Sequence, residues 1–190
     1  MALIKDGSGK GFVARVNSDL QLVTRATAVE QRLVSALDEN YYEATTGQIT
    51  LANATETGII YLKNSDTEKV LVIDRVFYDL WASTAGADDA VLRYYKTVTI
   101  TGGTDITPNN TNFSSANSAI GTFKKSLTSF SGTEWWTAYI VESSSNALEE
   151  GRIILNKNDT FAITVAAGTG NTDMKVSVNV AFYYFDATLV

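Results

Sequence analysis

The feature that most constrains the fold is the alternation of apolar and polar residues in the C-terminal segment MKVSVNVAFYYF. Successive side chains of an extended strand point to opposite faces of a sheet. Its apolar positions are Val176, Val178, Val180 and Phe182, and the polar positions between them are Lys175, Ser177 and Asn179. We therefore expect a strand with the first set buried in a core and the second set exposed to solvent.

Seven other segments have the same extended character and are separated by turn residues. They are GQITLAN, GIIYLKN, KVLVIDRVFYDLW (69–81), AVLRYYKTVTI (90–100), EWWTAYIV, GRIILN and DTFAITVAAG. Short strands with turn signals between them and almost no helix are typical of an antiparallel β-sandwich or barrel. The sequence therefore predicts an all-β domain over residues 45–190, with the turn NKND (156–159) joining two strands as a hairpin.

The first 44 residues differ from the rest and predict an extended N-terminal arm with one short helix. Thr27 and Glu30 form a capping box, and Val29, Leu33 and Leu37 follow at helical spacing, which predicts a helix from about residue 28 to 37. Residues 1–32 carry a net charge of +2, whereas the whole chain carries −6. A basic segment on an acidic body is consistent with docking.

The stretch DGSGKGFVARV, at residues 6–16, resembles a phosphate-binding loop only superficially. Such a loop needs G-x-x-x-x-G-K-[ST] between a strand and a helix. Here Ile4 precedes Gly9 by five positions, and Gly11 follows Lys10. The run that follows is strand-like, so no helix N-terminus is available to hold phosphate. The glycines instead indicate a pliable segment that can follow another protein's surface.

Composition excludes several chemistries. The chain of 190 residues has no cysteine and no histidine, which removes thiolate and Ser-His-Asp catalysis and the commonest zinc ligands. A net charge of −6 disfavours duplex-DNA binding, and no stretch has the length of a membrane span or the character of a signal peptide. We expect a soluble, non-enzymatic protein made in the cytoplasm, with no cofactor, metal, nucleic acid or membrane partner.

Two kinds of residue pair remain as candidate sites. The acidic pairs at residues 88–89 and 149–150 could suggest glycoside cleavage, but they fall at expected loop edges and are better explained as solvated turn acids. The aromatic pairs Trp135–Trp136 and Tyr94–Tyr95 lie on expected strands, so one member of each should face the core. The other member would contact a subunit or the arm, or alternatively stack on a sugar.

Several phrases of the chain resemble tailed-phage virion proteins of the capsid decoration (cement) or head-auxiliary kind. They are DGSGKGFVARVNSDLQLVTRA, a helix before ENYYEATT, GIIYLKNSDTEKVLVIDRV, the polar connection NNTNFSSANS, and the closing GTGNTDMKVSVNVAFYYF. The resemblance covers nearly the whole chain and includes no catalytic signature. It implies a jelly-roll-like sandwich, assembly as a trimer or other homo-oligomer, and attachment to the major capsid protein on the outside of the virion.

These lines together predict a non-enzymatic protein that decorates and stabilises a phage capsid, binding the shell through its arm. The candidate capsid or subunit contacts are Lys5, Gly7, Gly9, Lys10, Gly11, Phe12, Arg15, Leu33, Leu37, Trp135 and Trp136. The alternative is a head or tail fibre module that recognises host glycans through exposed aromatic residues. For the arm, the alternative is that it completes the sandwich or swaps into a neighbouring subunit.

Overall fold

The computed structural model describes residues 35–81, 89–141, 146–148, 153–168 and 173–186, together with the backbone of 15–16 and 22–23. The chain divides into two compact units, residues 1–30 and 31–190. In the first unit, β1 (Arg15–Val16) pairs antiparallel with β2 (Leu22–Val23). Most of the predicted arm, including residues 28–34 of its predicted helix, lies outside the described residues, and only one helical turn is described, at 35–37.

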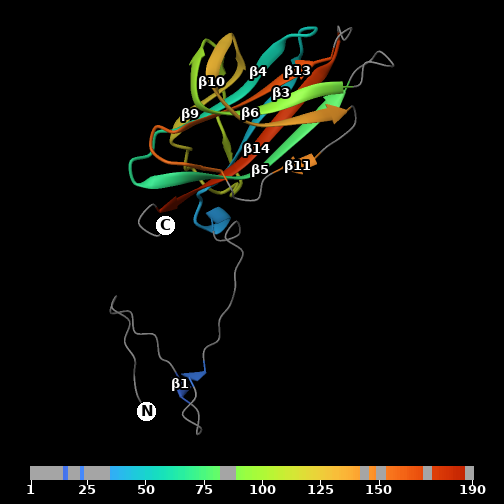
Figure 1. Cartoon of the computed structure of the whole chain (residues 1–190). Coiled ribbons are helices and arrows are strands. Elements are labelled where there is room, and N and C mark those ends of the chain that lie inside the picture. The colour runs from blue at the N-terminus through green and yellow to red at the C-terminus, as the bar shows by residue number, and fades with distance from the viewer. Residues whose placement is uncertain are drawn as a thin grey trace. The chain divides into compact units, whose positions relative to one another are not determined.

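The second unit is an antiparallel sandwich of two sheets (Figure 1). One sheet has the strand order β11-β5-β14-β3-β8, with β12 also pairing with β5, and the other has the order β10-β6-β13-β4-β9-β7. The bounds of these strands are β3 Tyr41–Thr50, β4 Glu56–Asn64, β5 Lys69–Trp81, β6 Asp89–Thr101, β7 Thr104–Asp105, β8 Asn109–Asn110, β9 Gly121–Leu127, β10 Ser129–Val141, β11 Asn146–Leu148, β12 Ile153–Leu155, β13 Thr160–Ala167 and β14 Lys175–Asp186.

The eight strands expected from the sequence pair in a nested order along the chain. β3 pairs with β14, β4 with β13, β5 with β12, and β6 with β10. Each early strand thus meets a late one, which is the double-sheet wrapping of a jelly roll. The predicted all-β, jelly-roll-like antiparallel sandwich is confirmed, and β7, β8 and β9 are an insertion between β6 and β10.

The core lies between the two sheets and is built from the inward side chains of both. On β14 the four apolar residues of the alternating pattern, Val176, Val178, Val180 and Phe182, are completely buried. The Phe182 ring stacks on Phe123 of β9, in the opposite sheet, with ring centroids 5.3 Å apart. The predicted core positions of this strand are therefore confirmed.

The three polar residues of the β14 pattern are half-buried, and the expectation that they are exposed is wrong. β14 is a central strand with β3 on one side and β5 on the other, so neighbouring side chains flank it on both sides. The amide of Asn179, for example, reaches Glu43 on β3. Alternation correctly identifies which face a residue occupies, but the exposure of that face depends on the neighbouring strands.

The turn at residues 156–159 does not form the predicted hairpin. β12 before it pairs with β5 in one sheet, whereas β13 after it pairs with β4 and β6 in the other. The turn itself is present, since the Asp159 carboxylate accepts hydrogen bonds from the Asn156 backbone and side-chain amides at 2.9 and 3.0 Å. It therefore carries the chain from one sheet across to the other.

β3 begins at Tyr41, so residues 41–44 of the predicted arm belong to the sandwich. Tyr42 and Ala44 are buried in the main core, and the Tyr42 ring stacks on Phe182 with centroids 5.7 Å apart. The run of tyrosines at 41–42 supplies the apolar surface that this part of the strand buries. A chain cut at residue 45 would lose the first half of a central pairing partner of β14.

The sheet with the order β10-β6-β13-β4-β9-β7, which we call the curled sheet, curls so that the chain crosses between its two sides at one corner. After β6 the chain passes through Gly102 and Gly103 into β7, the strand at one edge of this sheet, which pairs with β9. From β9 the chain continues through Thr128 into β10, the strand at the other edge, which pairs with β6. The curl encloses a second, small apolar cluster on the face opposite the main core. Its buried members are Tyr61, Val98, Leu127 and Ala162, with Tyr95, Ile100 and Phe130 packed beside them.

Gly102 is expected to be indispensable at this corner. Its backbone is left-handed, with φ of 68°, and a Cβ there would clash with the Thr128 hydroxyl oxygen. Gly47, with φ of 62°, has no atom within 4 Å of the position that a Cβ would take, and it is the matched control. Gly47→Ala should cost about 1–2 kcal/mol of unfolding free energy because of its backbone alone.

Gly102→Ala should cost at least about 1 kcal/mol more than Gly47→Ala, since a clash is added to the same backbone penalty. Urea unfolding of the two variants and the parent protein measures the difference. Equal losses of stability would show that Thr128 moves aside without cost and that the corner is loosely packed.

Candidate functional site

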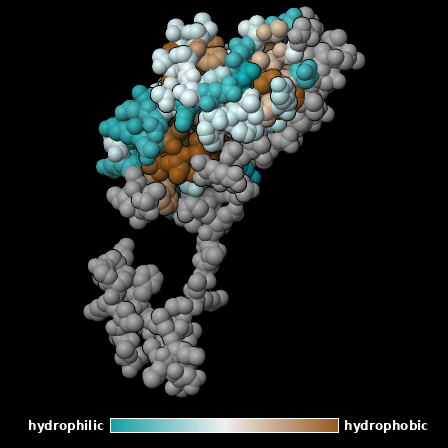
Figure 2. All heavy atoms as spheres, viewed as in Figure 1, coloured by the Kyte–Doolittle hydropathy of each residue, from teal (hydrophilic) through white to brown (hydrophobic). Residues whose placement is uncertain are grey.

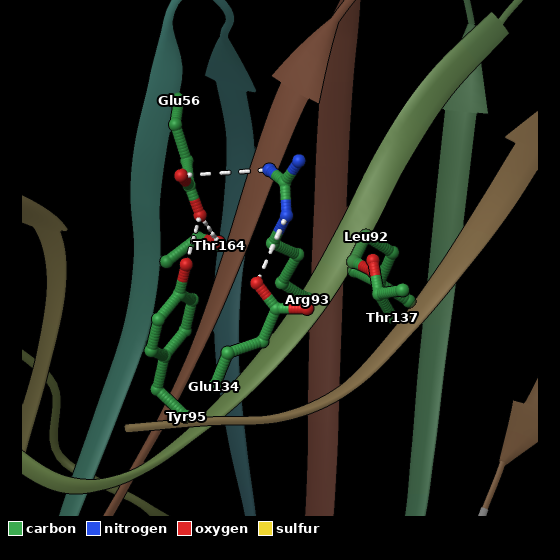
Figure 3. Close-up of polar contacts among 7 residues, drawn as sticks. All are labelled: Glu56, Leu92, Arg93, Tyr95, Glu134, Thr137 and Thr164. Atoms are coloured by element: carbon green, nitrogen blue, oxygen red, sulfur yellow. Dashed lines mark hydrogen bonds and ion pairs between the residues drawn. The ribbon is translucent and has the colours of Figure 1, made fainter. Parts of the chain in front are cut away.

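A network of charged and hydroxyl side chains lies on the curled sheet (Figure 3). Arg93 of β6 forms ion pairs with Glu56 of β4, at 3.4 Å, and with Glu134 of β10, at 3.5 Å. The Tyr95 hydroxyl donates to Glu56 at 3.0 Å, and the Thr164 hydroxyl of β13 donates to the same carboxylate oxygen. We call these five residues the ionic cluster; they link four strands.

The chemistry of the ionic cluster favours a structural role over catalysis. Glu56 accepts two hydroxyl hydrogen bonds and pairs with a guanidinium, so its oxygens are already engaged. A general base needs an oxygen that can reach a substrate proton. Burial, and to a lesser extent the hydrogen bond to Glu56, raises the pKa of Tyr95 to about 12, so this phenol stays neutral.

Of the tryptophan pair, Trp136 packs against the main core and Trp135 stays exposed, as predicted, but the two indoles lie against the same ring. A register shift between Glu134 and Trp136 makes Trp135 an extra residue on β10. Both indoles therefore contact Tyr94, with ring centroids 6.4 Å away for Trp135 and 4.8 Å away for Trp136. The tyrosine pair does divide as predicted, since Tyr94 lies in the main core and Tyr95 in the small apolar cluster.

The displaced Trp135 forms part of the wall of an open cleft of about 340 Å³, and 47% of its surface remains exposed. The apolar wall continues with β12, where Ile154 is also half-exposed, and with Phe161 at the start of β13. The other lining residues are polar. They come from β6, at a point where its register with β10 shifts, and from the turn before β13 and the first residue of β13. We call this hollow the Trp135 cleft.

A second candidate surface is the connection between β7 and β9, residues 106–120, which we call the Phe113 loop. Its polar residues bind one anchor, Glu39. The Glu39 carboxylate accepts hydrogen bonds from the Ser115 hydroxyl at 2.7 Å and the Asn117 amide at 3.0 Å, and its backbone carbonyl accepts from the Asn110 amide at 2.8 Å. These bonds hold the loop in one conformation against the start of β3.

Three exposed apolar side chains belong to the segments that these hydrogen bonds join. Phe113 is 99% exposed at the tip of the loop, Leu37 is 68% exposed just before Glu39, and Ile120 is 53% exposed where the loop ends. Tyr184 donates its backbone N–H to Asn40 and its hydroxyl to the Ile120 carbonyl, which keeps that end of the loop beside the start of β3. We call Leu37, Phe113 and Ile120 the apolar end.

The visible face of the sandwich is largely hydrophilic or neutral. Figure 2 shows teal and white residues over most of it, with a large brown, apolar area and smaller ones among them. Exposed apolar side chains that gather on one surface are typical of interaction sites, whereas single scattered ones need no explanation. The apolar end is therefore a candidate contact surface, and Tyr139, which is 82% exposed on β10, is a separate one.

The structure brings together few of the contact residues named from the sequence. Leu37 belongs to the apolar end, Trp135 lines the cleft, and Trp136 is partly buried against the main core. Arg15 lies in β1 with its side chain outside the described residues. The remaining ones, Lys5, Gly7, Gly9, Lys10, Gly11, Phe12 and Leu33, lie outside the described residues altogether.

Sequence reasoning did not find the ionic cluster or the Glu39 anchor. Glu56 and Thr164 are 108 residues apart and meet only through strand pairing. Of the acidic pairs considered, Asp89 begins β6, and Asp88, Glu149 and Glu150 lie outside the described residues. The lone phenylalanine among polar residues in NNTNFSSANS was the available signal for the Phe113 loop.

Within the described part of the chain, no three acidic residues come together as metal ligands, and no helix there is long and apolar enough to cross a membrane. Comparison of the chain with family models, with curated proteins and with solved structures finds no match.

The ionic cluster predicts a specific loss of stability at high pH. An unfolded tyrosine ionises near pH 10, whereas the pKa of Tyr95 in the folded protein is raised to about 12. The contribution of this phenol to the free energy of unfolding is complete below about pH 10 and is lost as the pH rises through about 12. The reason is that Tyr95 loses its proton at a lower pH in the unfolded state than in the folded state. Tyr95→Phe should flatten the fall in unfolding free energy over this window.

Urea unfolding at several pH values between about 9 and 12 makes the comparison. Tyr139→Phe, at an exposed tyrosine of the same sheet, is the control and should keep the parental pH dependence. An unchanged fall in the Tyr95→Phe protein would mean that Tyr95 is not held neutral by folding.

Proposed function

We propose that this chain is a non-enzymatic structural protein of a tailed-phage virion, which decorates the capsid and binds the outer shell through its N-terminal arm. The observation that carries the proposal is the apolar end, where Leu37, Phe113 and Ile120 are exposed on the two segments that Glu39 joins. Leu37 belongs to the proposed arm and lies four residues before β3, the first strand of the sandwich. We propose that the apolar end contributes to the same capsid contact as the rest of the arm.

The Phe113 loop has the properties of a preformed contact. An aromatic side chain that is 99% exposed gains most from being buried by a partner, on the order of 1.5–3 kcal/mol. Because Glu39, Tyr41 and the loop's own asparagines already bind its backbone and side chains, binding requires little further ordering. When a loop loses little conformational entropy on binding, more of the free energy gained by burying its surface contributes to affinity.

Self-association of the protein is proposed as well, in the form of a trimer. β10 is a strand of 13 residues at the edge of its sheet, and β6 is the only described strand that pairs with it. Edge strands offer unpaired N–H and C=O groups to another chain. Tyr139, exposed on this strand, supplies apolar area for such a contact.

Removal of the arm tests the attachment directly. The cut belongs at residue 30, where the two compact units divide, because a cut at 45 would remove the start of β3. We expect a chain beginning at Gln31 to keep its β circular dichroism and oligomer mass but to lose co-sedimentation with capsids that lack this protein. Undiminished decoration would contradict the proposal, and a fall to monomers would favour an arm that joins subunits.

Phe113→Ser tests the apolar end in the full chain. The side chain is 99% exposed, so thermal stability should change little, whereas capsid affinity should fall by about tenfold or more. Ile154→Ser, which also removes a half-exposed apolar side chain but from the Trp135 cleft, should leave capsid binding unchanged. Equal capsid affinity of Phe113→Ser and the parent protein would remove the apolar end from the proposed interface.

A further inference from the structure

We propose that the Trp135 cleft is a carbohydrate-binding site for one pyranose unit of a glycan. The cleft shares no residue with the apolar end, so the inference does not depend on capsid attachment. Its volume of about 340 Å³ lies at the lower end of the range for small-ligand pockets, and it is open to solvent on one side. An open hollow of this size suits one ring of a longer chain.

The apolar wall offers a flat ring to a ligand. Trp135 stacks against the fully buried Tyr94, with ring planes 21° apart, yet keeps 47% of its surface exposed. Tyr94 thus supports the indole from the core side while part of the indole remains open to the cleft. Aromatic rings combine a large apolar surface with defined orientation, and a pyranose presents C–H groups on its faces that pack on such a surface.

The rim of the cleft supplies both donors and acceptors of hydrogen bonds. Lys96 offers an ammonium group, Asn158 an amide, Thr97 a hydroxyl and Asp159 a carboxylate, and all four residues are exposed. One Asp159 oxygen is engaged with Asn156, which fixes the carboxylate. Sugar hydroxyls both donate and accept, so a mixed rim around an apolar wall matches the edge of a sugar ring.

The backbone around the rim departs from regular strand geometry. Thr97 has φ of 54° and Asn158 has φ of 68°, and both line the cleft. Asparagine adopts this left-handed conformation readily, but for a β-branched residue it is strained. Strained residues gather at binding sites, where the surrounding structure holds them in place.

The same features disfavour other ring-shaped ligands. Among the described lining residues Lys96 is the only cation, and Asp159 balances its charge, so the cleft offers little attraction to the phosphate of a nucleotide. A peptide side chain would use the apolar wall but would leave the four polar residues of the rim without a ligand group to bind. A neutral sugar can pack on the apolar wall and also form hydrogen bonds with the polar rim.

Isothermal titration calorimetry on the full-length protein tests the site. The probes are methyl α-glucoside, methyl β-galactoside, methyl N-acetyl-β-glucosaminide, maltohexaose and chitotetraose, with adenosine and phenylalanine amide as the competing ring types. We expect saturable binding of at least one saccharide at millimolar concentration. The proposal is overturned if no saccharide binds, or if adenosine or phenylalanine amide binds more tightly than every saccharide.

Two variants locate the binding. Trp135→Ala removes the flat wall, and Lys96→Met removes a hydrogen-bond donor while leaving the contact between Trp135 and Tyr94 intact. Each should weaken saccharide binding by about tenfold or more. Lys96→Met decides the result if Trp135→Ala lowers the melting temperature.

Phe113→Ser, which removes an exposed aromatic ring outside the cleft, should bind saccharide as the parent does. Retention of parental affinity by Lys96→Met and by a folded Trp135→Ala would place the sugar elsewhere and overturn the assignment to this cleft. Because Phe113→Ser also reports on capsid attachment, failure of one proposal is distinguished from failure of the other.

Discussion

Burial of one face of each sheet against the other is the constraint on which the rest of the structure depends. Phe182 illustrates it, since this ring on β14 stacks on Phe123 of the opposite sheet and on Tyr42 of the neighbouring strand. Each fully buried large apolar side chain contributes roughly 1.5–3 kcal/mol. A partly exposed ion pair such as Arg93 with Glu134 contributes at most about 1 kcal/mol. Burial of the core therefore contributes most of the stability of the sandwich, and the ionic cluster contributes less.

The curl of the sheet that runs from β10 to β7 is the second organising feature. At one corner, Gly102 and Gly103 connect β6 to β7, and Thr128 connects β9 to β10. The curl also covers part of the face that points away from the main core. The covered part is apolar near the corner, where the small apolar cluster lies, and polar where Glu56 and Arg93 lie. Acidic and basic groups that might suggest catalysis are thereby paired across three strands.

The two candidate surfaces arise from different departures from regular structure. The Trp135 cleft exists because an extra residue in β10 brings a second indole to Tyr94. The apolar end exists because Glu39 binds a long polar loop and leaves Phe113 at its tip. In each case the regular sheets provide a rigid support, and the irregular segment provides the surface offered to a partner.

The sequence by itself determined the fold class, the eight main strands and the inward residues of β14, because alternation is a local property of each strand. It could not show that the turn at 156–159 crosses between sheets, since a strand's pattern does not name its pairing partner. It could not place the boundary of the arm either, because Tyr41 and Tyr42 become core residues only when β14 lies beside them. The bulge at Trp135 and the union of Glu56 with Thr164 were decided by tertiary structure alone, through pairings between strands distant in sequence.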